Sequence, residues 1–419
     1  MNKKRNVGFI STRLCGIDGV SLETAKWAKI LEEEGYICFY MAGELDRPPQ
    51  RSFLVEEAHF KHPEIREIFR RCFNNKQVRE SFITEKIDKI KNKLKKKIYQ
   101  FLKEFKIDLV IVENALSLPL NLPLGIAITE VIAETGIPTI AHHHDFYWER
   151  KNLLVNCVWD YINMAFPPHL SFVQHVVINS SADNQLSLRT GISATIIPNV
   201  MDFDNPPSID DYSSDVRENL GLSPDEFLIL QPTRVVKRKG IEHSIELVKR
   251  LGMKAKLVIT HASGDEGYEY EKRIREYSSL MGVDALFISE IIKPYRGRTK
   301  DGRKIYTPWD VYPHADLVTY PSTFEGFGNA FLEAIYFKKP IVVNNYSIYA
   351  IDIKPKGFRV IELDDYVNSE AVELTRKVLK DSEFAREMVE HNYEVARKYY
   401  SCSVLRRKLN VLLSNCFGI

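Results

Sequence analysis

At 419 residues the chain is too long for one ordinary hydrophobic core, so its length predicts two α/β domains. Apolar residues make up 44% of the sequence and charged residues 27%, a balance typical of soluble globular proteins. The formal net charge of +2 gives no global argument for nucleic-acid binding, and no nucleic-acid partner is expected.

Targeting and redox features are sparse. Six cysteines lie far apart without a Cys-x-x-Cys pair, which indicates neither a zinc site nor a disulfide framework. The first apolar run, Val7 to Ile10, is too short for a signal peptide. The best candidate for a membrane span, 107–138, is interrupted by charged residues and prolines. We therefore expect a cytoplasmic protein, either freely soluble or peripheral to a membrane.

The first half of the chain alternates short apolar strands with helical segments. Val7–Ser11 predicts a strand, 13–20 a glycine-bearing loop and 21–34 a helix, an order that suits phosphate binding. A long, strongly charged helical region is expected at 51–105. The other strands expected in this half are 36–42, 107–112, 138–142, 175–179 and 194–199, with a helix at 180–190.

The segment 85–106 is predicted to be a basic amphipathic helix. Its apolar residues recur at helical spacing, and its polar side carries seven lysines between Lys86 and Lys97. Such a helix can lie on an anionic membrane surface. It can equally pack on a sheet with its lysines in water, which is the default arrangement in α/β domains and the interpretation we favour.

Three consecutive histidines, His142 to His144, end the strand expected at 138–142 and are followed by Asp145. Neighbouring residues on a strand point to opposite faces, so three consecutive histidines are not expected to bind one metal ion. Ligand sites of α/β proteins gather at the carboxyl ends of strands. His144 is therefore a candidate active-site residue.

The second half repeats the strand–helix alternation after a linker rich in proline and aspartate near 202–211. Asp202 and Asp204 fit an Asp-x-Asp metal pattern, but their place in this linker favours a domain connection. A basic loop is expected at 293–308. The strands expected here are 226–231, 255–261, 285–289, 316–320 and 340–344, with helices from 241, at 268–281 and at 382–417.

A basic turn follows the first strand of this half. Between Pro232 and Gly240 it carries Arg234, Lys239 and two further cations. Arginine offers a planar fork of donors and lysine a compact charge, and both suit phosphate oxygens.

The stretch from Tyr320 to Ala334 combines a strand end, a glycine turn and a helix start. The turn carries Glu325, and Glu333 follows in the helix. Glycines let a ligand approach the backbone, and amides at a helix start favour an anion. The two carboxylates can face one polyhydroxyl ligand from two directions.

These stretches resemble retaining glycosyltransferases of the GT-B fold, family 4 in particular. Glu325 and Glu333 match their Glu-x7-Glu element, the 234–240 turn their Arg…Lys-Gly element, and 197–202 their interdomain hinge. Asp18-Gly19-Val20 stands where the family has Gly-Gly-Val, so Gly19 matches and Asp18 departs. The resemblance implies two Rossmann-like domains, 1–203 and 204–395, facing a central cleft. It also implies a terminal helix, 396–419, that crosses back to the first domain.

The resemblance also assigns roles to residues. Arg234 and Lys239 would hold the diphosphate of a nucleotide sugar, Glu333 the ribose, and Glu325 the donor sugar as a catalytic residue. His144 and Asp145 would lie at the reaction centre. The remaining donor-binding residues implied are Gly19, Gly326, Phe327, Gly328 and Asn329. Fixed cations would act in place of a metal ion, so no metal site, no metal requirement and no cofactor are expected.

The activity implied is transfer of mannose or glucose, with retention, from GDP-mannose, UDP-glucose or ADP-glucose to a hydroxyl acceptor. Arg13, Arg150 and Lys151 favour a small acidic acceptor, such as a glycerate glycoside or a sugar phosphate. The basic segment 85–106 favours a lipid-linked or polysaccharide acceptor at a membrane surface instead. A nucleotide-sugar epimerase or a non-catalytic relative would share the fold, but the complete set of motif side chains favours the transferase.

Overall fold

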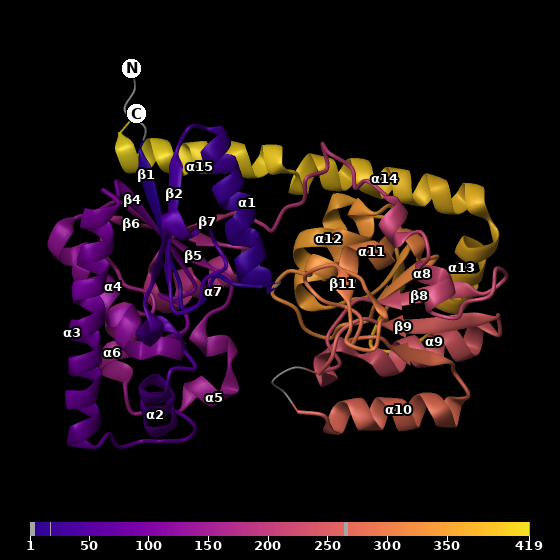
Figure 1. The fold of residues 1–419 in the computed structure, drawn as a ribbon, viewed down its shortest axis with the longest axis horizontal. Helices are drawn as coiled ribbons and strands as arrows, with labels where there is room; N and C mark the ends of the chain where they lie inside the picture. The colour runs from indigo at the N-terminus through magenta and orange to yellow at the C-terminus, as the bar shows by residue number, and fades with distance from the viewer. Residues whose placement is uncertain (1–4, 17, 264–266, 419) are drawn as a thin grey trace. The chain divides into compact units, whose positions relative to one another are not determined.

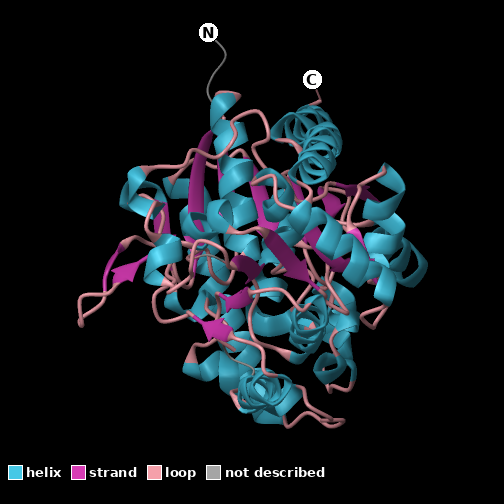
Figure 2. Ribbon diagram, turned by 90° about the vertical axis from the view of Figure 1, so that its right-hand side faces the viewer, coloured by secondary structure: helices cyan, strands magenta, loops and turns pink. Residues whose placement is uncertain are grey.

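The computed structural model describes residues 5–16, 18–263 and 267–418. The chain divides into two compact units, Met1–Asn199 with Ser403–Ile419, and Val200–Cys402. The domain ends expected at 203 and 396 lie a few residues from these divisions, while residues 1–4 and 419 fall outside the described part. Each unit is an α/β fold with its own parallel sheet (Figures 1 and 2).

The first unit is built on a seven-stranded sheet in the order β3-β2-β1-β4-β5-β6-β7, with every pair parallel. The chain adds strands outward from β1 in one direction and from β4 in the other. The switch point between β1 and β4 is where α/β folds bind ligands. The strands are β1 Asn6–Ile10, β2 Ile37–Ala42, β3 Ser52–Leu54, β4 Leu109–Glu113, β5 Thr139–His143, β6 Val173–Val177 and β7 Ala194–Ile196.

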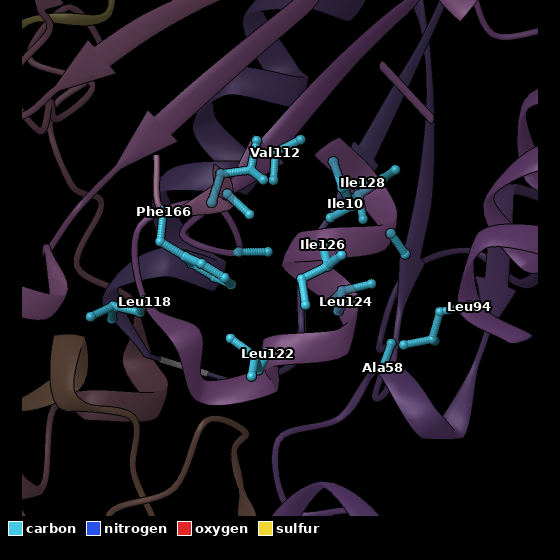
Figure 3. Packing of buried hydrophobic residues seen from close by; sticks show 14 of the residues in the cluster. Ile10, Ala58, Leu94, Val112, Leu118, Leu122, Leu124, Ile126, Ile128 and Phe166 are labelled. Carbon is cyan, nitrogen blue, oxygen red and sulfur yellow. The ribbon is translucent and has the colours of Figure 1, made fainter. Parts of the chain in front are cut away.

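Helices cover both faces of this sheet, with α3 and α4 on one side and α1 on the other (Figure 1). Figure 3 shows the core on the α3–α4 side, where Ile10 and Val112 of the sheet meet Leu94 of α3 and Leu124 and Ile128 of α4. The helices are α1 Gly19–Glu33, α2 Pro63–Cys72, α3 Ser81–Glu104, α4 Leu122–Thr135, α5 Lys151–Leu154, α6 Trp159–Ala165, α7 Ser180–Thr190 and α15 Cys402–Phe417.

Two features of the first unit differ from the sequence expectation. The region 51–105 is not one helix, because β3 pairs with β2 and an interruption separates α2 from α3. The helix α4 was missed inside an apolar run. Its residues are buried on most sides, so it lacks the one-sided pattern by which a surface helix is identified. Asn121 caps its first turn, and Gly136 ends it with a φ of 64°.

Four lysines of α3 form ion pairs inside the unit. Lys86 pairs with Glu67, and Lys93 with Glu57. Lys91 and Lys95 both reach Glu130 of α4, at 3.0 and 2.7 Å. With its apolar side in the core, α3 is the packed helix that the sequence analysis favoured. Within the described residues, no helix combines the length and apolar character that crossing a membrane requires.

The second unit has a six-stranded parallel sheet in the order β10-β9-β8-β13-β14-β15, with its switch point between β8 and β13. The strands are β8 Phe227–Gln231, β9 Ala255–Ile259, β10 Ala285–Phe287, β13 Leu317–Tyr320, β14 Ile341–Asn344 and β15 Ile361–Leu363. The helices are α8 Val216–Asn219, α9 Ile241–Leu251, α10 Glu269–Met281, α11 Pro308–Val311, α12 Asn329–Tyr336, α13 Ser369–Lys380 and α14 Ser382–Tyr400.

Two regions of the second half differ from the sequence expectation. The basic loop 293–308 contains a hairpin of β11 Gly297–Arg298 and β12 Lys304–Ile305. Three of its cations, Arg296, Arg303 and Lys304, form ion pairs within the unit, for example Lys304 with Asp215 at 2.9 Å. The terminal helix expected at 382–417 is interrupted at Ser401, where α14 ends and α15 begins. The side chain of Lys408 on α15 donates to the carbonyl of Ile196, 2.6 Å away, in the first unit.

Candidate functional site

The candidate site of the second unit forms where two neighbouring central strands end. The basic turn after β8 leads into α9, and the glycine turn after β13 leads into α12. Because β8 and β13 pair in parallel, both turns emerge at the same edge of the sheet, at its switch point. Two motifs that lie more than 80 residues apart in sequence are therefore brought together.

A buried charge cluster joins the two turns. The ammonium group of Lys239 contacts Oε1 of Glu325, and Nη1 of Arg238 lies 3.0 Å from Oε2 of the same carboxylate. Lys239 and Glu325 are only 8% and 9% exposed. Burial alone would raise the pKa of Glu325, but the charges of Lys239 and Arg238 outweigh it and lower this pKa. Glu325 is thus an ionised carboxylate that pairs with two cations, and the cluster keeps a net positive charge.

His261 belongs to the same neighbourhood and was not identified from the sequence. It lies just beyond the end of β9, the strand next to β8. Burial, followed by the charges of Lys239 and Arg234, lowers the pKa of His261 to about 4. The exposed Arg234 and the buried Lys239 therefore both act electrostatically on His261. An anion bound here would meet two cations beside a neutral imidazole.

The glycine turn is shaped by close packing. Gly328 has a φ of 123°, and a Cβ there would lie 2.5 Å from the hydroxyl of Tyr346. That hydroxyl donates to the carbonyl of Phe327 at 2.8 Å, which holds the turn against the sheet. Gly326 and Asn329 flank this point, between Glu325 and the body of α12. The sequence requirement for glycine at 328 is thus a steric one.

Glu333 lies on α12 and is held by a buried tyrosine. The hydroxyl of Tyr312 donates to Oε2 of Glu333 at 2.7 Å. Burial and the adjacent carboxylate raise the pKa of Tyr312 well above its ordinary value, so the phenol keeps its proton. The hydrogen bond fixes one carboxylate oxygen of Glu333.

The first unit has its own polar cluster at its switch point. Glu113 ends β4 and pairs in register with His142 of β5. His144 is the first residue after the end of β5. Oε2 of Glu113 lies 3.0 Å from Nδ1 of His142 and 3.0 Å from Nε2 of His144. Burial would raise the pKa of Glu113, but the two histidines outweigh it and lower this pKa to about 2. Burial lowers the pKa of His142, whereas the hydrogen bond and charge of Glu113 raise that of His144.

The three histidines divide as the strand geometry predicts. His142 and His144 turn to Glu113, whereas His143 points to the other face. There Nε2 of His143 lies 2.9 Å from Nδ1 of His175. All three histidines are buried, with at most 9% of each exposed. Glu113, His142 and His144 offer ligand atoms within 4.8 Å of one another, a set that could hold a metal ion.

The remaining residues predicted in the first unit have local partners. The carboxylate of Asp145 pairs with Arg150 at 2.6 Å. Asp18 caps α1 by accepting a hydrogen bond from the backbone N–H of Ser21, and it also pairs with Arg13 at 3.0 Å. The amides next to Gly19 therefore already have a carboxylate at the helix start. This explains why the sequence departs from Gly-Gly-Val here.

The predicted residues thus fall into two groups. Arg234, Lys239, Glu325 and Glu333 gather in the second unit, together with the turn 326–329. His144, Asp145 and Gly19 lie in the first unit. No role was predicted from the sequence for Glu113, Arg238 or His261. Of these, Glu113 carried a signal, since an acid that directly ends an apolar strand is unusual.

Comparison with known proteins adds independent findings. A family model described as Glycosyl transferases group 1 matches residues 303–395. A mannosylglucosylglycerate synthase of Thermotoga maritima is 33% identical, with 92% of this chain and 94% of the relative covered. Another of the same name, from Petrotoga mobilis, is 31% identical and covers 85% and 86%.

Solved structures show the same fold at low identity. A glycosyltransferase from Rickettsia africae matches with a TM-score of 0.68 and 14% identity, over 99% of this chain and 98% of that one. A complex of Anabaena HepE with UDP and glucose matches with a TM-score of 0.65 and 13% identity, over 98% and 100%.

Proposed function

The chain belongs to the group 1 glycosyltransferases and has their GT-B fold of two Rossmann-like units, and from this premise we propose that it is a retaining hexosyltransferase that glycosylates a small acidic glycerate glycoside. The observation that carries the donor part is the buried cluster of Lys239, Arg238 and Glu325 at the switch point of the second unit. The acceptor part is supported by the two relatives named mannosylglucosylglycerate synthase, which match most of the chain.

The second unit holds the donor. Arg234 and Lys239 bind the diphosphate, Glu333 binds the ribose hydroxyls, and Glu325 binds hydroxyls of the sugar. The amides of the turn 326–329 assist. Lys239 is already neutralised in part by Glu325, so the diphosphate meets a cluster whose geometry is set before it arrives. Such preorganised cations need no reorganisation during the reaction.

The reaction builds negative charge on the leaving diphosphate. As the bond between the anomeric carbon and the phosphate oxygen breaks, the acceptor hydroxyl oxygen bonds to the same carbon. Its proton passes to the leaving phosphate oxygen on the same face of the sugar, and the anomeric configuration is retained. Arg234 and Lys239 stabilise the departing charge, the role that a metal ion has in other transferases. The diphosphate is thus held without a metal ion.

The first unit supplies the acceptor side. His144 and Asp145 are the proposed contacts to the acceptor hydroxyl region, and Arg150 and Arg13 attract its carboxylate. Both arginines are paired with acids now, but exposed ion pairs are worth only about 0–1 kcal/mol. A substrate carboxylate can therefore replace Asp145 or Asp18 as the partner. The pairing of four α3 lysines with acids favours this acceptor over a membrane-bound one.

A donor screen followed by an acceptor screen tests the proposal. Thermal shift is recorded with GDP, UDP, ADP and GDP-mannose, UDP-glucose and ADP-glucose, each with and without EDTA. One nucleotide at a hundred times its dissociation constant should add about 2.7 kcal/mol of stability, with or without EDTA. That donor is then incubated with glucosylglycerate, glycerate, a sugar phosphate and a glycolipid, and the product is analysed by NMR.

The expected outcome is transfer to glucosylglycerate, with the anomeric configuration of the donor preserved in the product. Inversion would reject the retaining mechanism alone. Nucleotide binding abolished by EDTA would reject the metal-independent donor site. Transfer only to the glycolipid would reject the acidic acceptor in favour of the membrane-surface alternative. Binding without transfer to any acceptor would favour a non-catalytic relative or an epimerase.

A further inference from the structure

The cluster at the switch point of the first unit has a rigid frame. Glu113 and His142 are register partners on two adjacent parallel strands, and His144 is two residues beyond His142 on the same face. The ring of His142 also stacks on Trp27 of α1, with ring centroids 4.3 Å apart. The sheet and this stacking contact therefore fix Glu113 and His142. His144 follows the end of β5, where its backbone N–H donates to Oδ1 of Asn114 at 2.7 Å.

Hydrogen bonds do not satisfy this cluster. Only the contact between His144 and Glu113 has hydrogen-bond geometry. Among the described residues, Oε1 of Glu113 and both ring nitrogens of His142 have no hydrogen-bond partner, although Glu113 is 0% and His142 1% exposed. Nδ1 of His142 lies 3.0 Å from Oε2 of Glu113 without the angle of a hydrogen bond. Buried polar atoms without partners are costly and call for an explanation.

A cation bound between these atoms would supply that explanation. Ligands about 2.0–2.1 Å from a metal ion stand roughly 3.0–3.4 Å from one another when they occupy neighbouring coordination positions. The two separations of 3.0 Å from Oε2 to the histidine nitrogens fall at the short end of this range. All three ligand atoms lie within 4.8 Å of one another.

We propose that Glu113, His142 and His144 form a binding site for a divalent first-row transition-metal ion, with Nδ1 of His142, Nε2 of His144 and the carboxylate of Glu113 as ligands. Two imidazoles and one carboxylate suit Zn²⁺, Fe²⁺, Co²⁺ or Ni²⁺ better than Mg²⁺, which prefers oxygen ligands alone. Three protein ligands leave at least one coordination position for water or a ligand oxygen. His144 is the most exposed of the three and marks the open side.

This site is separate from the metal-independent donor site proposed for the second unit. The ion would bind in the first unit, on residues that contribute nothing to the diphosphate cluster of Lys239 and Glu325. Metal binding is therefore measured without nucleotide, and nucleotide binding is measured in EDTA. Failure of one proposal leaves the other standing.

The experiment uses the full chain without an affinity tag, because polyhistidine tags bind the same ions. Metal content is determined by mass spectrometry on the protein as purified. The protein is then stripped with a chelator, and Zn²⁺ and Co²⁺ are titrated in by calorimetry and visible absorption. The variants are Glu113→Gln, His142→Gln and His144→Gln. The control is His143→Gln, which changes the neighbouring buried histidine on the opposite face.

The expected result is one ion per chain in the wild type and in His143→Gln, with affinity at least 100-fold weaker in each ligand variant. Bound Co²⁺ should show ligand-field absorption bands that disappear in the ligand variants. Circular dichroism reports whether each variant folds. If the buried Glu113→Gln and His142→Gln do not fold, the more exposed His144→Gln decides. Absence of stoichiometric binding, or equal binding by the ligand variants and the wild type, would overturn the proposal.

Discussion

The pairing of Lys239 and Glu325 makes a quantitative prediction about the second unit. Both side chains are less than 10% exposed, so removing one leaves the other charge buried without its partner. Such a loss typically costs about 3–5 kcal/mol, whereas replacing both charges with apolar residues is often close to neutral. The two variants should therefore show strong coupling in a double-mutant cycle.

The structure also predicts which single variant is worse. Glu325 pairs with both Lys239 and Arg238, so Glu325→Leu leaves two cations without their partner and should cost about 4 kcal/mol. Lys239→Met leaves Glu325 paired with Arg238 and should cost about 2 kcal/mol less. The double variant should be more stable than the sum of the single variants predicts, by at least about 1–3 kcal/mol. For a unit of this size, 4 kcal/mol corresponds to roughly 8–16 °C in melting temperature.

The assay is thermal and urea unfolding of wild type, both single variants and the double variant, followed by fluorescence. Glu325→Gln serves as the control for shape, since it keeps the side-chain volume and one acceptor but loses the charge. Equal losses in the two single variants, with simple additivity in the double variant, would refute the reasoning. This result would mean that the charges are solvated and that the cluster is not a preformed anion site.

Contacts elsewhere in the chain lead to further predictions. Diphosphate binding should offset the charges of Arg234 and Lys239 and so raise the pKa of His261 from about 4, giving proton uptake near pH 5. Calorimetry in buffers of different ionisation enthalpy measures this uptake, which His261→Asn should abolish. Gly328→Ala should weaken nucleotide binding at least tenfold, since its Cβ would lie 2.5 Å from the hydroxyl of Tyr346. The double variant Gly328→Ala, Tyr346→Phe should recover part of the lost nucleotide affinity. Asp18→Ala should cost about 1 kcal/mol in unfolding free energy by uncapping α1, whereas Asp18→Asn should not.

These predictions have distinct points of failure. Proton uptake that persists in His261→Asn would place the titrating group elsewhere. Unchanged nucleotide affinity in Gly328→Ala would show that the glycine turn does not approach the donor. Equal stability of Asp18→Ala and wild type would mean that the cap contributes little, and the start of α1 would then be available to an anion.

His261 also predicts the direction of a stability change with pH. Its pKa is lowered to about 4 in the folded chain, against about 6.5 in an unfolded one. Between these values the unfolded chain binds more protons, so the folded state loses stability as the pH falls from 6.5 toward 4. His261→Asn should flatten this part of the curve, and an unchanged slope would contradict the assignment.

The sequence alone determined the local chemistry and the order of the elements. Strand periodicity placed most strands within a few residues, because short apolar runs bounded by turn residues have few alternatives. The basic turn at 234–240 and the turn from Glu325 to Gly328 were identified as ligand-binding segments, since their composition suits anions and close backbone approach whatever surrounds them. The helix α4 was missed because burial on most sides removes the one-sided pattern of a surface helix.

Only the tertiary structure decided which side chains meet. The pairing of β8 with β13 brings Arg238 and Lys239 to Glu325, and no sequence pattern sets that register. The pairing of β4 with β5 does the same for Glu113 and the two histidines. Strand order also put His261 beside the cations, and packing paired the α3 lysines with acids that lie far away in sequence. Charge states and ligand sets depend on distances of a few ångströms between separate strands, and a linear sequence does not encode those distances locally.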